Sequence, residues 1–231
     1  MVTELLRPRS RLFGPGVWKG SAQPRVALTF DDGPHPVDTP AILDILSSAG
    51  ARATFFFVGA FARSHPDLVR RAAREGHEIG VHSDTHPWWF SVAGPRRVRR
   101  EVREAARVLG DLSERRPRFF RPPMGHKNIF LADELASAEL WMATWSTRAF
   151  DTLGRPPEKI LDRILRGATP GSVILLHEGV RRATGHPSPT VTALPGILEG
   201  LKRRGLEAVT LGDLQAAQGK EAKPARRSAS A

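Results

Sequence analysis

Two adjacent carboxylates, Asp31 and Asp32, come directly after a short apolar run and directly before a Gly-Pro pair. The run from 26 to 30 is typical of a buried strand, and Gly33-Pro34 is typical of the turn that ends one. Folds of the α/β class place their chemistry at the carboxyl ends of strands. Because side chains alternate along a strand, the two acids can point in different directions. One acid can bind a metal while the other moves a proton.

Further polar groups follow other apolar segments that are typical of strands. They are His82 with His86, Arg121, Asp151 and His177. A structural acid or histidine has no reason to recur at strand ends, whereas the catalytic groups of α/β barrels gather there. This recurrence is the strongest indication of an active site that the residues alone provide.

His82 and His86 are four residues apart, so they share one face if the segment turns helically. Two imidazoles and one carboxylate form a ligand set for a catalytic divalent metal that leaves positions open for water and substrate. With Asp32 as the carboxylate, we expect one divalent ion. Such ligands admit Zn²⁺, Co²⁺, Ni²⁺ or Mn²⁺, and Zn²⁺ is our prediction.

A metal in such a site lowers the pKa of a bound water and polarises a carbonyl oxygen. Hydrolysis then needs a base for the water and an acid for the leaving group. Asp31 suits the base, and His177 suits the acid. Arg121 is suited to hold Asp31 in its ionised form through a bidentate contact.

Strand-like and helix-like segments alternate about seven times along the chain. We expect strands at 26–30, 53–58, 77–81, 119–121, 140–145, 172–176 and 206–211, and helices at 39–49, 66–75, 95–109, 132–138, 156–168 and 190–204. Such repeats form a parallel sheet with helices outside it, either closed as a barrel or open and doubly wound. No Gly-x-Gly-x-x-Gly or Walker-type loop supports a nucleotide cofactor.

The chain of 231 residues is long enough for one domain with a substantial core. Lys and Arg number 35 against 24 Asp and Glu, which gives a formal net charge of +11. Much of this excess lies on helix-like stretches such as 96–100, and no nucleic-acid-binding signature accompanies it, so we predict no nucleic-acid partner. The absence of cysteine excludes disulfides, thiolate ligands and a cysteine nucleophile.

Residues 1–23 mix Arg, Pro and Gly without a period and predict an extended lead-in to a catalytic domain at 24–217. Residues 218–231 predict a basic disordered tail. The sequence shows neither a signal peptide pattern nor a run that could span a bilayer. We therefore expect a cytoplasmic protein or one peripheral to the membrane, and a secreted one if the natural start lies further upstream.

Four segments stand in order along the chain: Thr29-Phe30-Asp31-Asp32-Gly33-Pro34, His82-Ser83-Asp84-Thr85-His86, Arg121-Pro122-Pro123-Met124-Gly125 and Leu175-Leu176-His177. They resemble the first, second, third and fifth motifs of the polysaccharide deacetylase family, also called the NodB-homology family or carbohydrate esterase family 4. The resemblance covers roughly residues 25–211. It implies a single-domain distorted (β/α)7 barrel and metal-dependent removal of N- or O-acyl groups from sugars.

The resemblance also implies a role for each matching residue. Asp31 is then the general base, His177 the general acid and Arg121 the group that orients Asp31. Asp32, His82 and His86 bind the metal, and Ser83 supports the second motif. The substrate-binding residues are Pro123, Met124, Gly125 and Trp145, with the backbone N–H near Met124 stabilising the oxyanion.

The chain departs from the family pattern at two places. Met124 stands where the third motif usually has an aromatic residue. In the fourth motif Arg148 replaces the first acid, Asp151 keeps the second and Thr152 replaces the final tryptophan. We therefore expect Asp151 to tune His177.

Our first interpretation is a hydrolase that removes an N-acyl group, in the first place N-acetyl, from an amino sugar in a glycan or glycolipid. The positive charge would suit an anionic glycolipid or a nucleotide-sugar-like substrate. A carbohydrate-binding relative without turnover is the second interpretation, and an amidohydrolase of non-sugar amides is the third, because a family fixes chemistry better than substrate. Trp88, Trp89 and Trp145 are candidates for stacking on sugar rings, with core or rim packing as the alternative.

Overall fold

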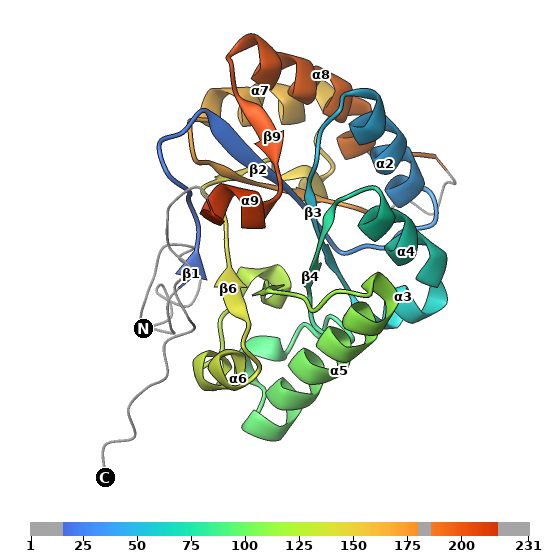
Figure 1. Ribbon diagram of the computed structural model, residues 1–231, viewed down its shortest axis with the longest axis vertical. Helices are drawn as coiled ribbons and strands as arrows, with labels where there is room; N and C mark the ends of the chain where they lie inside the picture. The colour runs from blue at the N-terminus through green and yellow to red at the C-terminus, as the bar shows by residue number, and fades with distance from the viewer. Residues whose placement is uncertain (1–15, 180–185, 217–231) are drawn as a thin grey trace.

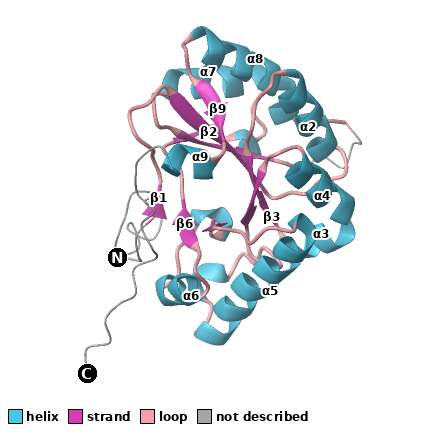
Figure 2. Cartoon of the chain, in the orientation of Figure 1, coloured by secondary structure: helices cyan, strands magenta, loops and turns pink. Residues whose placement is uncertain are grey.

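In the computed structural model the described residues are 16–179 and 186–216, and they form one curled sheet with helices outside it (Figures 1 and 2). The strands are β1 (Gly16–Val17), β2 (Arg25–Asp31), β3 (Thr54–Phe57), β4 (Glu78–Val81), β5 (Phe119–Phe120), β6 (Trp141–Ala143), β7 (Thr147–Arg148), β8 (Val173–His177) and β9 (Glu207–Val209). The α-helices are α2 (Asp38–Ser48), α3 (Gly59–Ser64), α4 (Pro66–Arg74), α5 (Pro95–Ser113), α6 (Leu131–Ser137), α7 (Pro157–Gly167), α8 (Pro189–Arg203) and α9 (Leu211–Ala216). Short 3₁₀ helices are η1 (Phe90–Val92), η2 (Pro123–Gly125) and η3 (Asp151–Leu153).

The strands of this sheet pair in parallel in the order β1-β6-β5-β4-β3-β2-β8-β7, with β9 beside β2. From β2 to β6 each strand lies next to the one before it, as successive βα units require. Helices α2 to α8 lie around the outside of the strands, and α9 lies near the middle of the view (Figure 1). This is a distorted (β/α)7 barrel, which confirms the predicted fold class.

The side chains of β2 alternate between two apolar clusters. Val26, Leu28 and Phe30 pack outward in the large cluster beneath the helices. Ala27 packs in the smaller inner cluster. Asp31 has the same parity as Ala27, so the alternation of a strand turns its carboxylate toward the inside of the barrel.

Each strand and helix expected from the sequence has a counterpart, with different ends. The last strand, expected at 206–211, ends at Val209, and α9 follows it. Leu211 N donates to Thr54 Oγ1 at 2.8 Å, so α9 is held against the start of β3. α9, α3, β1 and β7 are elements that the sequence interpretation does not contain. β1 lies inside the expected lead-in 1–23, whereas residues 1–15 and the expected tail 218–231 lie outside the described residues.

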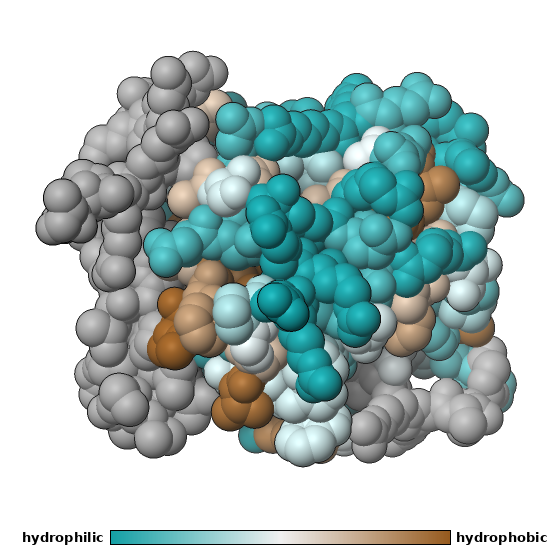
Figure 3. Space-filling model, turned by 90° about the horizontal axis from the view of Figure 1, so that it is seen from below, coloured by the Kyte–Doolittle hydropathy of each residue, from teal (hydrophilic) through white to brown (hydrophobic). Residues whose placement is uncertain are grey.

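The arginines of α5 lie on its solvent face. Arg103 Nε lies 2.5 Å from Glu134 Oε1, and Arg107 pairs with Glu104 and Asp111. Seen from the side of α5 and α6, the surface is mainly hydrophilic with separate hydrophobic patches (Figure 3). None of the helices in the described part of the chain combines the length and the apolar character needed to cross a bilayer.

Candidate active site and metal centre

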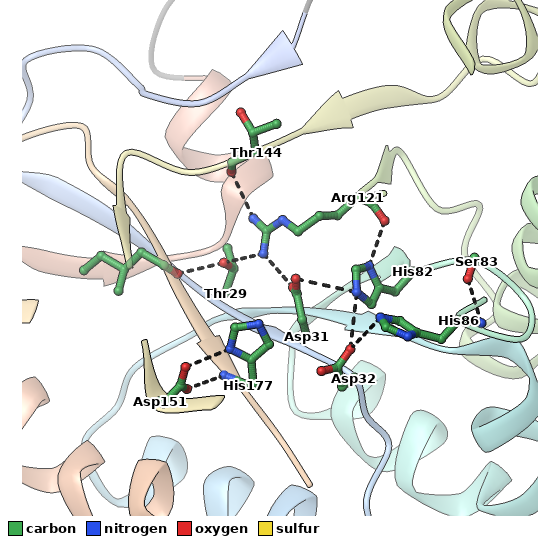
Figure 4. Close-up of polar contacts among 11 residues, drawn as sticks. Thr29, Asp31, Asp32, His82, Ser83, His86, Arg121, Thr144, Asp151 and His177 are labelled. Carbon is green, nitrogen blue, oxygen red and sulfur yellow. Dashed lines mark hydrogen bonds and ion pairs between the residues drawn. The ribbon is translucent and has the colours of Figure 1, made fainter. Parts of the chain in front are cut away.

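The predicted catalytic and metal-ligating residues meet at the carboxyl edge of the sheet (Figure 4). In the pairing of β2 with β8, Asp31 lies opposite His177. The pairing of β4 with β5 ends at Val81 and Phe120, so the residues that follow, His82 and Arg121, also leave the sheet side by side. Because these strands are parallel, residues far apart in the sequence are collected at one edge.

Arg121 holds Asp31 through one direct hydrogen bond. Its Nη1 donates to Asp31 Oδ1 at 2.6 Å and to Thr29 Oγ1 at 2.8 Å, and its Nη2 donates to Thr144 O at 3.1 Å. The guanidinium also lies 4.0 Å from the centre of the Phe56 ring. Arg121 is fully buried, and burial lowers its pKa while the charge of Asp31 opposes this effect. The contact is through a single nitrogen, so the expected bidentate pairing is replaced by a guanidinium shared among three acceptors.

Asp32, His82 and His86 form the group that could hold a metal. Asp32 Oδ1 lies 3.3 Å from His82 Nε2 and 3.2 Å from His86 Nε2, and one ligand atom of each residue lies within 4.8 Å of the others. Burial acts to raise the pKa of Asp32, but the two imidazoles more than offset this, and the net pKa lies well below its usual range. Asp32 is thus an ionised carboxylate.

The protonation of His82 tests whether these residues fit a metal. His82 Nδ1 lies 2.7 Å from the backbone oxygen of Arg121, so we assign its proton to Nδ1, which donates to that oxygen. In the neutral ring, Nε2 then carries a lone pair, and this lone pair faces Asp32 Oδ1, a buried atom with no hydrogen-bond partner. A lone pair and a carboxylate oxygen this close repel each other unless a proton or a metal ion lies between them, and two imidazole nitrogens with one carboxylate fit a divalent ion.

Three residues of the site adopt left-handed backbone conformations that side chains other than glycine adopt rarely. Their φ angles are 73° at Asp32, 65° at Ser83 and 49° at His86. His86 N donates to Ser83 Oγ at 3.0 Å, so Ser83 supports the turn between the two histidines as expected. Such conformations persist where surrounding contacts enforce them, which is common at functional sites.

His177 is held by Asp151 at two points. Asp151 Oδ1 lies 2.8 Å from His177 Nδ1, and Asp151 Oδ2 accepts from His177 N at 2.7 Å. Thr190 Oγ1 also donates to Asp151 Oδ2, at 2.9 Å. Burial lowers the pKa of His177, but the charge and hydrogen bond of Asp151 outweigh burial and raise it to about 9. Asp151 is therefore the hydrogen-bond partner of His177, as the sequence predicts.

The third-motif residues and Trp145 pack as one unit. A Cβ atom at Gly125 would lie 2.3 Å from the Trp145 ring, and Gly125 has φ of 70°, so only glycine fits. Trp145 is 9% exposed and belongs to the inner cluster, whereas Met124 is 48% exposed beside buried Pro123. Of the other two candidates for stacking on sugar rings, Trp88 is 78% exposed and Trp89 packs against the guanidinium of Arg97.

Glu101 of α5 supports the loop between His82 and His86, and sequence reasoning did not find it. Its Oε2 accepts from Asp84 N at 2.9 Å and Thr85 N at 2.8 Å, and its Oε1 accepts from Thr85 Oγ1 at 2.8 Å. The side chain is fully buried. An acid between Val98 and Val102, on the apolar stripe of a helix, was the available signal.

The buried carboxyl group of Glu178 packs against Gly33 in the Asp-Asp-Gly-Pro turn. A Cβ atom at Gly33 would lie 2.4 Å from Glu178 Oε1, so a larger residue there would displace the carboxyl group of Glu178. Burial raises the pKa of Glu178 to about 8, although the hydrogen bond from Thr39 acts in the opposite direction. Nearby, Asp38 accepts from Gly179 N at 2.8 Å, which fixes the chain just after His177.

Comparison with known proteins agrees with this geometry. The family model described as polysaccharide deacetylase matches residues 19–143. The chain is 38% identical over 193 residues to a chitooligosaccharide deacetylase of Sinorhizobium fredii, covering 80% of this chain and 89% of that protein. It is also 38% identical over 189 residues to a peptidoglycan-N-acetylglucosamine deacetylase of Bacillus cereus, covering 80% of this chain and 66% of that protein.

A crystal structure of the Bc1960 peptidoglycan N-acetylglucosamine deacetylase has the same fold, with a TM-score of 0.78 and 34% identity over 86% of this chain and 92% of that one. The fold and the site define a hydrolase of the (β/α)7 barrel class. The chain belongs to the polysaccharide deacetylase family, whose enzymes act on carbon-nitrogen bonds other than peptide bonds.

Proposed function

We propose that this protein is a metal-dependent hydrolase that removes an N-acetyl group from an amino sugar in a glycan or glycoconjugate. One observation carries the proposal. The three residues that could hold a metal, Asp32, His82 and His86, lie at the same edge of the sheet as the carboxylate of Asp31 and the imidazole of His177, which is hydrogen-bonded to Asp151. Asp31 Oδ2 is 3.7 Å from His82 Nε2, so the carboxylate borders the ligand group directly. The relatives named as chitooligosaccharide and peptidoglycan N-acetylglucosamine deacetylases support the sugar substrate.

Asp32, His82 and His86 would hold one divalent ion, and we propose Zn²⁺. When bound, such an ion lowers the pKa of the attacking water and polarises the acyl carbonyl. Co²⁺, Ni²⁺ and Mn²⁺ suit the same nitrogen and oxygen ligands, so the native ion is a matter for metal analysis.

Asp31 is proposed to take the proton of the attacking water. Arg121 occupies its Oδ1, and Oδ2 remains on the side of the metal ligands. His177 is proposed to donate a proton to the amide nitrogen as the carbon-nitrogen bond breaks. With a pKa of about 9 the ring is protonated at neutral pH, which is the form that a general acid needs. The products are acetate and the free amino sugar.

The substrate-binding roles of Pro123, Met124, Gly125 and Trp145 remain proposals. Met124 is the one of these four side chains that is largely exposed, so it is the one able to contact a sugar through its side chain. Gly125 and Trp145 act through packing, because they fix the loop that carries the backbone N–H groups near Met124. Those groups are proposed to stabilise the developing oxyanion.

The test is acetate release by the Zn²⁺-loaded protein from N-acetylated monosaccharides, chitooligosaccharides and glycolipids, with formate release from N-formylated sugars measured in parallel. Asp31→Asn serves as the blank, because it keeps the size of the side chain but removes the base. Release by wild type that disappears in Asp31→Asn supports the proposal. Absence of release despite one bound metal per chain supports the carbohydrate-binding interpretation, and release from simple amides alone supports the non-sugar amidohydrolase.

A further inference from the structure

Three arginines surround the ring of Phe150, the residue just before Asp151. The guanidinium carbons of Arg148, Arg163 and Arg155 lie 3.8, 4.2 and 5.8 Å from the centre of this ring. Within residues 16–179 and 186–216, none of the three has a carboxylate partner within 4.0 Å. Three positive charges therefore share one aromatic ring without a negative charge to balance them.

One polar atom of this arginine cluster is buried without a partner, while the residues Arg148 and Arg163 are exposed. Arg155 Nε is buried and has no hydrogen-bond partner. Arg163 Nε donates to the backbone oxygen of Arg148 at 3.2 Å, which brings the two side chains together. Partial burial and the nearby charge of Arg163 lower the pKa of Arg148. By contrast, Arg166, one turn further along α7, pairs with Asp162. The cluster is thus unlike an ordinary solvated helix face.

The backbone that carries Arg148 and Phe150 lies next to the strand that carries His177. β7 pairs in parallel with β8, and this pairing sets Arg148 opposite Leu175, two residues before His177. Strand geometry then puts the backbones of Arg148 and His177 roughly 8 Å apart. Phe150 is followed by Asp151, which holds His177.

We propose that Arg148, Arg155 and Arg163 bind an oxyanion, a phosphate or a carboxylate, that the substrate carries close to its acetylated amino sugar. This inference rests on the proposed function, which it deepens by naming an anionic glycoconjugate as the substrate class. Guanidinium groups bind oxyanions through paired N–H donors, and an aromatic face holds them in place while leaving those donors free.

The kinetic test compares the Zn²⁺-loaded wild type with the double variant Arg148→Gln/Arg163→Gln. The substrates are N-acetylglucosamine 1-phosphate, the carboxylate-bearing N-acetylmuramic acid and the neutral methyl N-acetylglucosaminide. We expect wild type to prefer one of the anionic sugars by kcat/KM, and the anionic-to-neutral ratio to fall about tenfold or more in the double variant. The preferred sugar tells phosphate from carboxylate.

The matched control is Arg166→Gln/Arg203→Gln, which removes the same charge from two exposed, ion-paired positions. It should keep the wild-type ratio. A ratio that is the same in the Arg148→Gln/Arg163→Gln variant, or that falls equally in the control, overturns the inference.

A binding measurement separates this inference from the proposed function. Inorganic phosphate is titrated calorimetrically into the full chain, with and without Zn²⁺. Binding that is lost in Arg148→Gln/Arg163→Gln supports the cluster even if no sugar is deacetylated, in which case the proposed function alone fails. Wild-type protein that binds no phosphate and shows no anionic preference, or binding that survives in the double variant, overturns the cluster as an anion site.

Discussion

Asp151 and His177 are joined by both oxygens of one carboxylate: Oδ1 lies 2.8 Å from the ring Nδ1 and Oδ2 lies 2.7 Å from the backbone N. The carboxylate therefore fixes the position of the backbone and the orientation of the ring together. It also sets the protonation of the ring, because its charge outweighs burial and raises the pKa of His177 to about 9. The orientation of the His177 ring and its ability to donate a proton therefore both depend on the side chain of Asp151.

Replacing Asp151 by Asn is expected to move the pH profile of the enzyme. A general acid must be protonated, so kcat falls as the pH rises through the pKa of His177. In Asp151→Asn burial continues to lower this pKa and only the charges of Asp31 and Asp32 still oppose it, so the alkaline limb should move to lower pH by roughly 1–3 units. Profiles of wild type and variant are measured with the same bound metal. An alkaline limb at the same pH in both would contradict the assignment of His177 as the acid tuned by Asp151.

Binding of Zn²⁺ to the chelator-treated protein should raise its melting temperature. A ligand that binds only the folded chain adds about 2.7 kcal/mol at one hundred times its Kd. For a chain of this size that corresponds to a rise of roughly 5–10 °C. Scanning calorimetry at increasing Zn²⁺ measures it.

The ligand assignment predicts which variants lose this rise. Asp32→Asn and His86→Ala should lose most of it, since each removes one member of the three-residue group. His126→Ala, a histidine outside the group, is the control and should keep it. If His126→Ala lost the rise and Asp32→Asn kept it, the metal would be bound elsewhere.

Glu101 is expected to set metal affinity without touching the metal. Its carboxylate accepts three hydrogen bonds from Asp84 and Thr85, which lie between the two histidines of the ligand group. In Glu101→Gln an amide N–H₂ replaces one acceptor, so the loop loosens and Zn²⁺ affinity should fall roughly 10–100-fold. Competition with a chelating dye measures the affinity. Glu104→Gln, an exposed position one turn along the same helix, is the control, and an equal loss there would deny Glu101 a specific role.

The parts of the fold that depend on local pattern were predictable from the sequence. The apolar runs that become β2, β3, β4 and β8 are buried on both faces, and continuous apolar runs are typical of such strands. Parallel strands share one carboxyl edge, so polar residues after several runs pointed to one site. The sequence pattern alone therefore predicts that Asp31, His82 and His177 lie in one site.

The parts that depend on distant contacts were not predictable. β1 and β7 have two residues each, too few to show a period, and they exist because β6 and β8 offer them an edge. Thr190 reaches Asp151 across 39 residues of chain, and no local pattern marks such a contact. The arginine cluster arises in the same way, because Arg163 comes from α7 and Arg148 from β7.

His77 is expected to make the fold sensitive to acid. Its ring is buried and its Nδ1 accepts from Ala53 N at 3.2 Å, and burial lowers its pKa from 6.5 to about 4. Between these two values the unfolded chain binds a proton that the folded chain does not, so stability falls as the pH falls through this window and stops falling below it. The shift corresponds to a loss of about 3 kcal/mol.

His77→Asn removes the titration and keeps an oxygen acceptor, so its free energy of unfolding should change less between pH 7 and pH 4 by about this amount. Urea unfolding at several pH values measures the difference, with equal m-values as the check that both proteins unfold alike. The same dependence on pH in wild type and variant would show that the acid sensitivity arises from other groups.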